Sequence, residues 1–207
     1  MEMSKTEFRS DSRKTKERIE KLEAYFRASV LTEDGSFICQ HDGACKNSFS
    51  DSLPRGIFYA GQLHYVGKHY DLFKNSQPLR IVVVGKSYGH KPAGYSMADR
   101  SEQFEDNGQH WSARGSGETG IPERNPHMSG TTFALRAAFG LGFDDISRAA
   151  ETIQLGEEKV HLYQAFALVD FLLSSAISED EKMGDRSTPR MRTNCTSHFR
   201  RTLEILV

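Results

Sequence analysis

The side chains best placed for chemistry follow a short apolar run near the middle of the chain. Residues 79–84 are mostly apolar and lead directly into Gly85-Lys86-Ser87-Tyr88-Gly89. A β-branched run bounded by Pro78 and a glycine predicts a strand buried on both faces, as in a parallel α/β sheet. Ligands of such sheets bind just beyond the carboxyl end of a strand. We therefore expect the loop from Lys86 to Gly89 to contact a ligand.

Three cysteines offer a second kind of chemistry. Cys39 and Cys45 lie on either side of His41, and Cys195 follows much later. In a reducing compartment three cysteines do not form a disulfide framework, whereas thiolate and imidazole bind metals. The spacing of Cys39 and His41 departs from common zinc knuckles, so a metal site and no metal both stay open.

Residues 186–201 form a segregated basic stretch, which offers a third kind of chemistry, the binding of phosphate. It holds no acidic residue, and its cationic and titratable side chains are Arg186, Arg190, Arg192, His198, Arg200 and Arg201. Such a stretch can attract phosphates even on a protein of near-neutral charge. The alternative interpretation is an ordinary solvated helix face.

Composition limits the class of protein. Hydrophobic residues make up 37% of the 207 residues, which is enough for a globular core, and the formal net charge is −1. No run approaches the roughly 18 apolar residues that a membrane span needs. Residues 1–13 lack the apolar region of a secretory signal. We therefore expect a cytoplasmic monomer that has no contact with a membrane.

Two helices are predicted at the ends of the chain. Ser10, Asp11 and Ser12 can cap a helix whose apolar positions repeat at helical spacing as far as Val30. We expect this helix to form an N-terminal arm, residues 1–32, on a domain formed by residues 33–207. A last helix is expected over residues 189–206, with a proline in its first turn.

The segments between these helices give weaker patterns. Residues 33–56 predict a loop that is held in place by a local interaction. Residues 86–128 predict a long polar connection. A helix is expected over residues 131–139, ended by glycines. The apolar stretch at residues 167–173 fits a strand or a buried helix, and we choose the strand. The chain stops in an apolar segment, so we expect that it is truncated.

Three segments, taken in order, resemble the uracil-DNA glycosylase superfamily, especially its iron–sulfur-bearing branch. The first is the strand with its Gly85–Gly89 loop, and the second is Met128-Ser129-Gly130, which opens a helix. The third is Val169-Asp170-Phe171-Leu172, followed later by Asn194-Cys195. The resemblance covers about 120 residues in order and approximate spacing. It implies an α/β fold, a three-layer sandwich around a mainly parallel sheet, incomplete at the C-terminus.

The resemblance also implies roles for individual residues. Enzymes of this kind extrude a nucleotide and read its base in a snug pocket. Lys86 and Ser87 would occupy the catalytic positions, with Lys86 in place of the water-activating carboxylate. The implied base-binding residues are Tyr88, Gly89, Met128 and Asp170. The implied DNA contacts are Arg186, Arg190, Arg192, His198 and Arg200.

An iron–sulfur cluster is the cofactor that the resemblance implies. Cys39, Cys45 and Cys195 would be its ligands, and the remaining position falls at Ser174. A [4Fe–4S] cluster normally takes four thiolates, so His41, Ser174 or an outside ligand would have to substitute. Zinc and the absence of any metal are the alternatives.

Three functions follow as hypotheses. The first is a DNA-base glycosylase-like hydrolase of DNA repair, acting on uracil or a related base, with DNA as its partner. The second is a module that binds nucleic acid or senses a base but has lost the chemistry. The third is a phosphate-binding α/β enzyme, although the loop has neither a G-x-G-x-x-G motif nor a P-loop.

Overall fold

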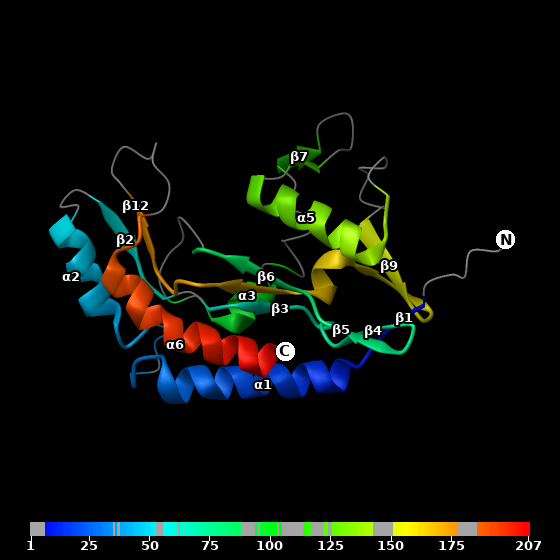
Figure 1. Cartoon of the computed structure of the whole chain (residues 1–207), viewed down its shortest axis with the longest axis horizontal. Coiled ribbons are helices and arrows are strands. Elements are labelled where there is room, and N and C mark those ends of the chain that lie inside the picture. The colour runs from blue at the N-terminus through cyan, green and yellow to red at the C-terminus, as the bar shows by residue number, and fades with distance from the viewer. Residues whose placement is uncertain are drawn as a thin grey trace. The chain divides into compact units, whose positions relative to one another are not determined.

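A computed structural model of the chain shows a mixed α/β protein (Figure 1). It describes residues 7–34, 36, 38–52, 56–61, 63–87, 94, 96–102, 104, 114–116, 122–123, 126–142, 151–177 and 186–207. The helices of this part are α1 (Ser12–Ser29), α2 (Asp42–Ser52), α3 (Met97–Glu102), α5 (Pro126–Phe139), α6 (Pro189–Leu206) and the 3₁₀ helix η3 (Leu162–Ala165). The strands are β1 (Phe8–Ser10), β2 (Ile57–Tyr59), β3 (Tyr65–Val66), β4 (Leu72–Lys74), β5 (Gln77–Leu79), β6 (Val82–Gly85), β7 (Arg114–Ser116), β8 (Pro122–Glu123), β9 (Thr152–Leu155), β10 (Glu158–His161), β11 (Ala167–Asp170) and β12 (Ser175–Ile177).

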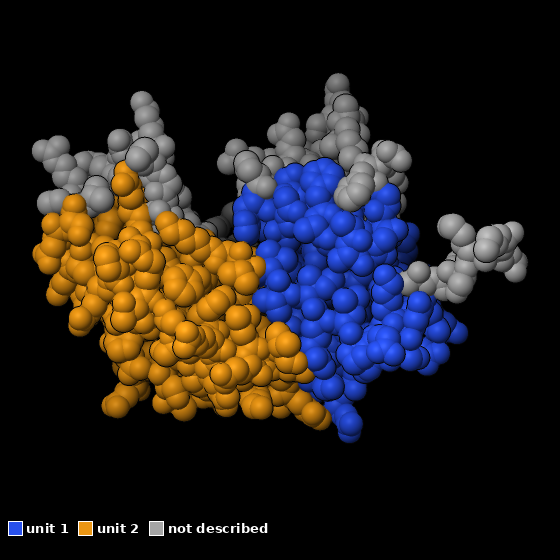
Figure 2. Space-filling view, viewed as in Figure 1, with its two compact units in different colours: residues 1–16, 66–83, 101–167 blue, residues 17–65, 84–100, 168–207 orange. Residues whose placement is uncertain are grey.

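Two compact units divide the chain (Figure 2). Unit 1 contains residues 1–16, 66–83 and 101–167, and unit 2 contains residues 17–65, 84–100 and 168–207. Each unit therefore combines three segments that are far apart in the sequence. Because neither unit is a continuous stretch, no change of composition along the chain could delimit them.

Unit 1 contains a sheet in the order β10-β9-β1-β4-β5. Its neighbours are antiparallel except for β1 and β9, which pair in parallel. The prediction of a mainly parallel sheet is therefore wrong here. Tight hairpins are the reason: Asn75 and Ser76 have φ of 49° and 66° between β4 and β5, and Gly156 has φ of 58° between β9 and β10. Two-residue turns with positive φ connect antiparallel strands.

The three-stranded sheet β3-β11-β6 is different, because β6 and β11 run parallel. Ala167 donates its N–H to the carbonyl of Ile81, and Phe171 donates to Gly85, each at 2.9 Å. The residue numbers of donor and acceptor increase together along the two strands, which is the register of a parallel pair. The predicted strand at 79–84 is thus confirmed only in part, because the run is divided between β5 and β6. Its predicted burial on both faces is wrong, since the Val84 side chain is 51% exposed.

The second apolar stretch forms a strand, as we predicted. All four residues of β11 are buried, but the strand ends at Asp170 rather than at Leu173. Leu172 and Leu173 remain buried after it. The choice between a strand and a buried helix could not be made from periodicity alone.

The loop predicted for residues 33–56 contains a helix, α2, which is a correction. Its buried residues Cys45 and Phe49 lie in one core cluster of unit 2. The other members of this cluster are Leu172, Ala176, Met191 and Cys195. The helix forms because distant segments bury its apolar residues, and the local Gly-, Asp- and Ser-rich sequence gave no indication of this.

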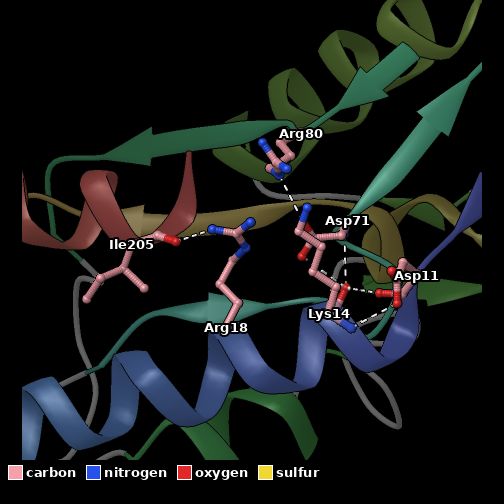
Figure 3. A network of polar contacts seen from close by, with 7 residues as sticks. Asp11, Lys14, Arg18, Asp71, Arg80 and Ile205 are labelled. Atoms are coloured by element: carbon pink, nitrogen blue, oxygen red, sulfur yellow. Dashed lines mark hydrogen bonds and ion pairs between the residues drawn. The ribbon is translucent and has the colours of Figure 1, made fainter. Parts of the chain in front are cut away.

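The predicted helices at both ends are confirmed. In α1, Leu22 and Phe26 are fully buried, and Asp11 caps the first turn by accepting the N–H of Lys14 at 2.9 Å (Figure 3). The bounds of α6 match the prediction, and the Thr188 hydroxyl accepts the N–H of Met191 at its start. Both helices combine a local cap with a regular apolar spacing, so short-range sequence signals were sufficient to predict them.

Helix α5 begins at Pro126, five residues before the predicted start at 131, and ends where predicted. Gly140 has φ of 71°, and the N–H of Leu141 bonds to the carbonyl of Arg136. This is the Schellman arrangement that a glycine after a helix favours.

Figure 3 shows one polar network in each unit. In unit 1, Arg80 Nε donates to the Asp71 carboxylate at 2.8 Å, and the Asp71 carbonyl accepts the N–H of Asp11. In unit 2, the guanidinium of Arg18 on α1 donates to the carbonyl of Ile205 in the last turn of α6. A cation at this position complements the negative end of the helix dipole and ties α1 to α6.

Candidate nucleic-acid interface

The carboxyl ends of β6 and β11 are hydrogen-bonded to each other in unit 2. The N–H of Phe171 donates to the carbonyl of Gly85 at 2.9 Å. The N–H of Leu172 donates to the carbonyl of Lys86, also at 2.9 Å. Lys86 is exposed and Ser87 is half-buried. We call residues 85–87 and 170–172 the strand end; the two segments that the sequence singled out do meet there.

Helix α6 is attached to the strand end by an aromatic contact. The ring of Phe171 packs edge-on against Phe199 at 5.3 Å between centroids. Edge-to-face pairs of this kind stabilise by about 1 kcal/mol beyond the burial of their surface. The residue after Phe199 is Arg200, so the contact brings the backbone of this part of the basic stretch to the strand end, while the Arg200 side chain projects about 100° further around the helix.

The predicted arginines of α6 and the segment before it are exposed. They are Arg186, Arg190, Arg192 and Arg200. Arg201 is also exposed but forms an ion pair with Glu204 at 2.8 Å. Since an α-helix turns by about 100° per residue, Arg190 and Arg201 lie on one line, while Arg192 and Arg200 lie elsewhere around the exposed side. The cations therefore cover the exposed side of α6 rather than a single stripe.

His198 does not belong to this surface, which corrects its predicted contact with DNA. It is 3% exposed and lies among the buried residues of α6. Burial lowers its pKa to about 4, although the Phe171 backbone opposes the shift. A neutral, buried imidazole cannot hold a phosphate.

Asp170 is also buried, and its carboxylate is already bound. Arg100 Nη2 on α3 donates to Asp170 Oδ2 at 3.1 Å, and both side chains are at most 3% exposed. The N–H of Asp170 donates to Nδ1 of His64 at 3.2 Å. These contacts account for Asp170 as a structural residue, so its predicted role as a base-reading group is not supported by the geometry.

The remaining predicted base-binding residues are Tyr88, Gly89 and Met128. Tyr88 and Gly89 lie outside the described residues. Met128 is 8% exposed on α5, in unit 1, whereas Lys86 and Asp170 belong to unit 2.

Each cysteine sulfur is the acceptor of an N–H hydrogen bond. The backbone of His41 donates to Cys39 Sγ and the side chain of Asn194 to Cys45 Sγ, each at 3.4 Å. The Leu173 backbone donates to Cys195. N–H donors to sulfur favour the thiolate, which is the form that binds metals.

The three thiols share one neighbourhood of unit 2. Burial, with smaller contributions from Cys39 and Cys45, raises the pKa of Cys195 to about 12, although the Leu173 backbone opposes the shift. Burial also raises the pKa of Cys39 and of Cys45, and the N–H donor to each sulfur opposes the shift. Within the described part of the chain, no three His, Cys, Asp or Glu side chains gather around a point that could hold a metal.

Sequence reasoning missed Arg100 and His64. Arg100 lies in the long polar connection, where nothing in the sequence distinguishes it from a surface arginine. His64 stands between Leu63 and Tyr65, and all three are buried. An apolar flank on both sides of a histidine was a usable indication of burial.

Comparisons with known proteins identify no relative: no protein-family model, curated protein or solved structure matches the chain. Among the described residues, no helix combines the length and apolar character that crossing a membrane requires.

We expect Asp170→Asn to lower the free energy of unfolding by about 3–5 kcal/mol, because it removes one charge of the buried ion pair with Arg100. Urea denaturation of the full chain measures this. Glu204→Gln is the control, since it breaks an exposed ion pair worth less than about 1 kcal/mol. Equal costs for the two variants would show that the buried pair does not hold β11 to α3.

Proposed function

We propose that the chain binds nucleic acid at the strand end and along α6, as a base-sensing module of uracil-DNA glycosylase-like design. The observation that carries this proposal is the hydrogen bonding of Phe171 and Leu172 to Gly85 and Lys86. It brings an exposed lysine to the carboxyl end of two parallel strands, the usual ligand-binding edge of such sheets. The proposal also implies that β6 and β11 belong to a mainly parallel sheet within a three-layer sandwich.

The charges support phosphate binding at this place. The chain has a net charge of −1, so attraction to DNA has to come from a local concentration of cations. Lys86 and the α6 arginines supply it, and Phe171 packs against Phe199 of the same helix. Contacts to phosphate give affinity that is independent of sequence and decreases with salt.

The double substitution Arg190→Ala with Arg200→Ala tests this interface. We expect weaker binding to labelled single-stranded and duplex DNA, and a plot of log affinity against log salt that is shallower by up to about 2, because each phosphate contact contributes about 0.9. Fluorescence anisotropy across a salt series measures both quantities. Lys21→Ala with Lys159→Ala is the matched control, since it removes two exposed lysines elsewhere. An unchanged salt slope in the arginine variant contradicts the proposal.

Base excision is the second candidate function, and the order and pairing of the two strand segments favour it. The residues available for catalysis argue against excision. Lysine cannot activate water as a carboxylate does, and the Asp170 carboxylate is bound to Arg100. We therefore place DNA binding first and excision second.

Release of free uracil from a uracil-containing single strand distinguishes the two functions. With the full chain purified anaerobically, we expect salt-sensitive binding and no release. Release that Lys86→Ala or Ser87→Ala abolishes would establish excision and replace the base-sensing function. Release that neither variant alters would point to a contaminating enzyme.

We also propose that Cys39, Cys45 and Cys195 hold an iron–sulfur cluster, with zinc as the alternative. The N–H donors to the three sulfurs and their shared neighbourhood support this. His41 or Ser174 would complete the set, and Ser174 directly follows the residue whose backbone bonds to Cys195. The bound group would link the Cys39 segment, α2 and α6. Free thiols of this kind persist in a reducing compartment, so we place the protein in the cytoplasm.

Metal content and visible absorption of anaerobically purified protein test the cysteine proposal. We expect iron with visible colour, lost in Cys195→Ser. Ser174→Cys would supply a fourth thiolate, so we expect it to retain iron longer against a chelator. Colourless protein containing stoichiometric zinc selects the alternative, and protein free of both metals overturns the proposal.

A further inference from the structure

His64 is a fully buried histidine whose ring is neutral by virtue of its hydrogen bond. Its Nδ1 accepts the N–H of Asp170 at 3.2 Å. An imidazole nitrogen that accepts a hydrogen bond carries no hydrogen, so the ring hydrogen is on Nε2. Nε2 itself is buried and has no hydrogen-bond partner among the described residues.

Among the described residues, the charged neighbours that act on His64 disfavour a positive charge on its ring. Phe26 of α1 packs edge-on against the ring at 5.2 Å, and His198 of α6 stacks on it at 6.1 Å. Arg100 of α3 is the nearby cation. The Asp170 carboxylate on β11 is bound to Arg100 and therefore already serves as the counter-charge of another residue.

A proton on His64 would act directly on β11. Nδ1 would become a donor facing the N–H donor of Asp170, so their hydrogen bond would break. The next two residues, Phe171 and Leu172, donate the hydrogen bonds at the carboxyl end of the pairing with β6. Loss of the bond to Asp170 would therefore release the strand at the carboxyl end of that pairing.

We propose that His64 is an acid-sensitive latch: protonation of its ring releases Asp170 and loosens the pairing of β11 with β6. This concerns the stability of the strand end and holds whether or not the strand end binds nucleic acid. Burial, then His198 and then Arg100, hold the pKa of His64 well below its ordinary value. The latch is therefore closed at neutral pH.

The direction of the pH dependence follows from this depressed pKa. Above the ordinary histidine pKa of about 6.5, His64 is neutral in both the folded and the open state and the latch is fully stable. As pH falls below that value, the open state binds the proton first, so stability is lost progressively. His198, with a pKa of about 4, adds to the loss in the same direction.

Amide hydrogen exchange of the full chain, followed by mass spectrometry from about pH 7 to about pH 4.5, tests the latch. After correction for intrinsic exchange, we expect protection of residues 168–173 to fall by at least about tenfold, as the linkage of about tenfold per pH unit requires. The same residues in His64→Asn should lose clearly less protection, keeping only the share of the pH dependence that His198 contributes, because the amide oxygen of asparagine accepts a hydrogen bond but does not titrate. His127→Asn, an exposed histidine of unit 1, is the control and should behave as wild type.

Three results would overturn the latch. One is wild-type protection of residues 168–173 that does not change with pH. Another is a His64→Asn protein that loses protection with the wild-type pH dependence. If His64→Asn does not fold, NMR titration of the wild-type imidazole decides. An ordinary histidine pKa for His64, with β11 still protected below it, also overturns the proposal.

Discussion

Unit 2 is organised around one buried charge, the carboxylate of Asp170. A carboxylate removed from water is tolerated only with a charged partner and further hydrogen bonds, and Arg100 is that partner. The pair connects α3 to the last residue of β11, while His64 holds the same residue by its backbone. The exposed groups of the strand end are thereby held by contacts in the interior. These contacts give Asp170 a structural role in unit 2.

Local sequence patterns predicted α1 and α6 because a cap and a regular apolar spacing occur together within a few residues. They did not predict α2, whose burial depends on residues of β12 and α6 far along the chain. The sheet of unit 1 was missed because Asn75-Ser76 and Gly156 were not recognised as hairpin turns. The direction of strand pairing depends on such turns more than on the strands themselves.

The candidate site shows the same contrast between what local sequence patterns predict and what depends on distant segments. The proximity of the Gly85 loop to the Phe171 segment was predictable, since both follow apolar strands whose carboxyl ends meet at one edge. The cysteines were recognisable by type, but the N–H donors to their sulfurs were not, because each donor comes from the tertiary fold. His198 was grouped with the DNA-contacting arginines because they are its neighbours in the sequence. Burial in the fold, rather than these neighbours, determines the charge of its side chain.

The division of each unit into three chain segments has a consequence for biosynthesis. Unit 1 has all its segments once residue 167 is made, whereas unit 2 needs residues 168–207 to join segments made much earlier. Until α6 appears, the apolar residues of α1 and α2 have no partner from that helix. Closing such long loops is slow and leaves apolar surface exposed meanwhile. We therefore expect unit 2 to be the part of the nascent chain that most needs protection by chaperones.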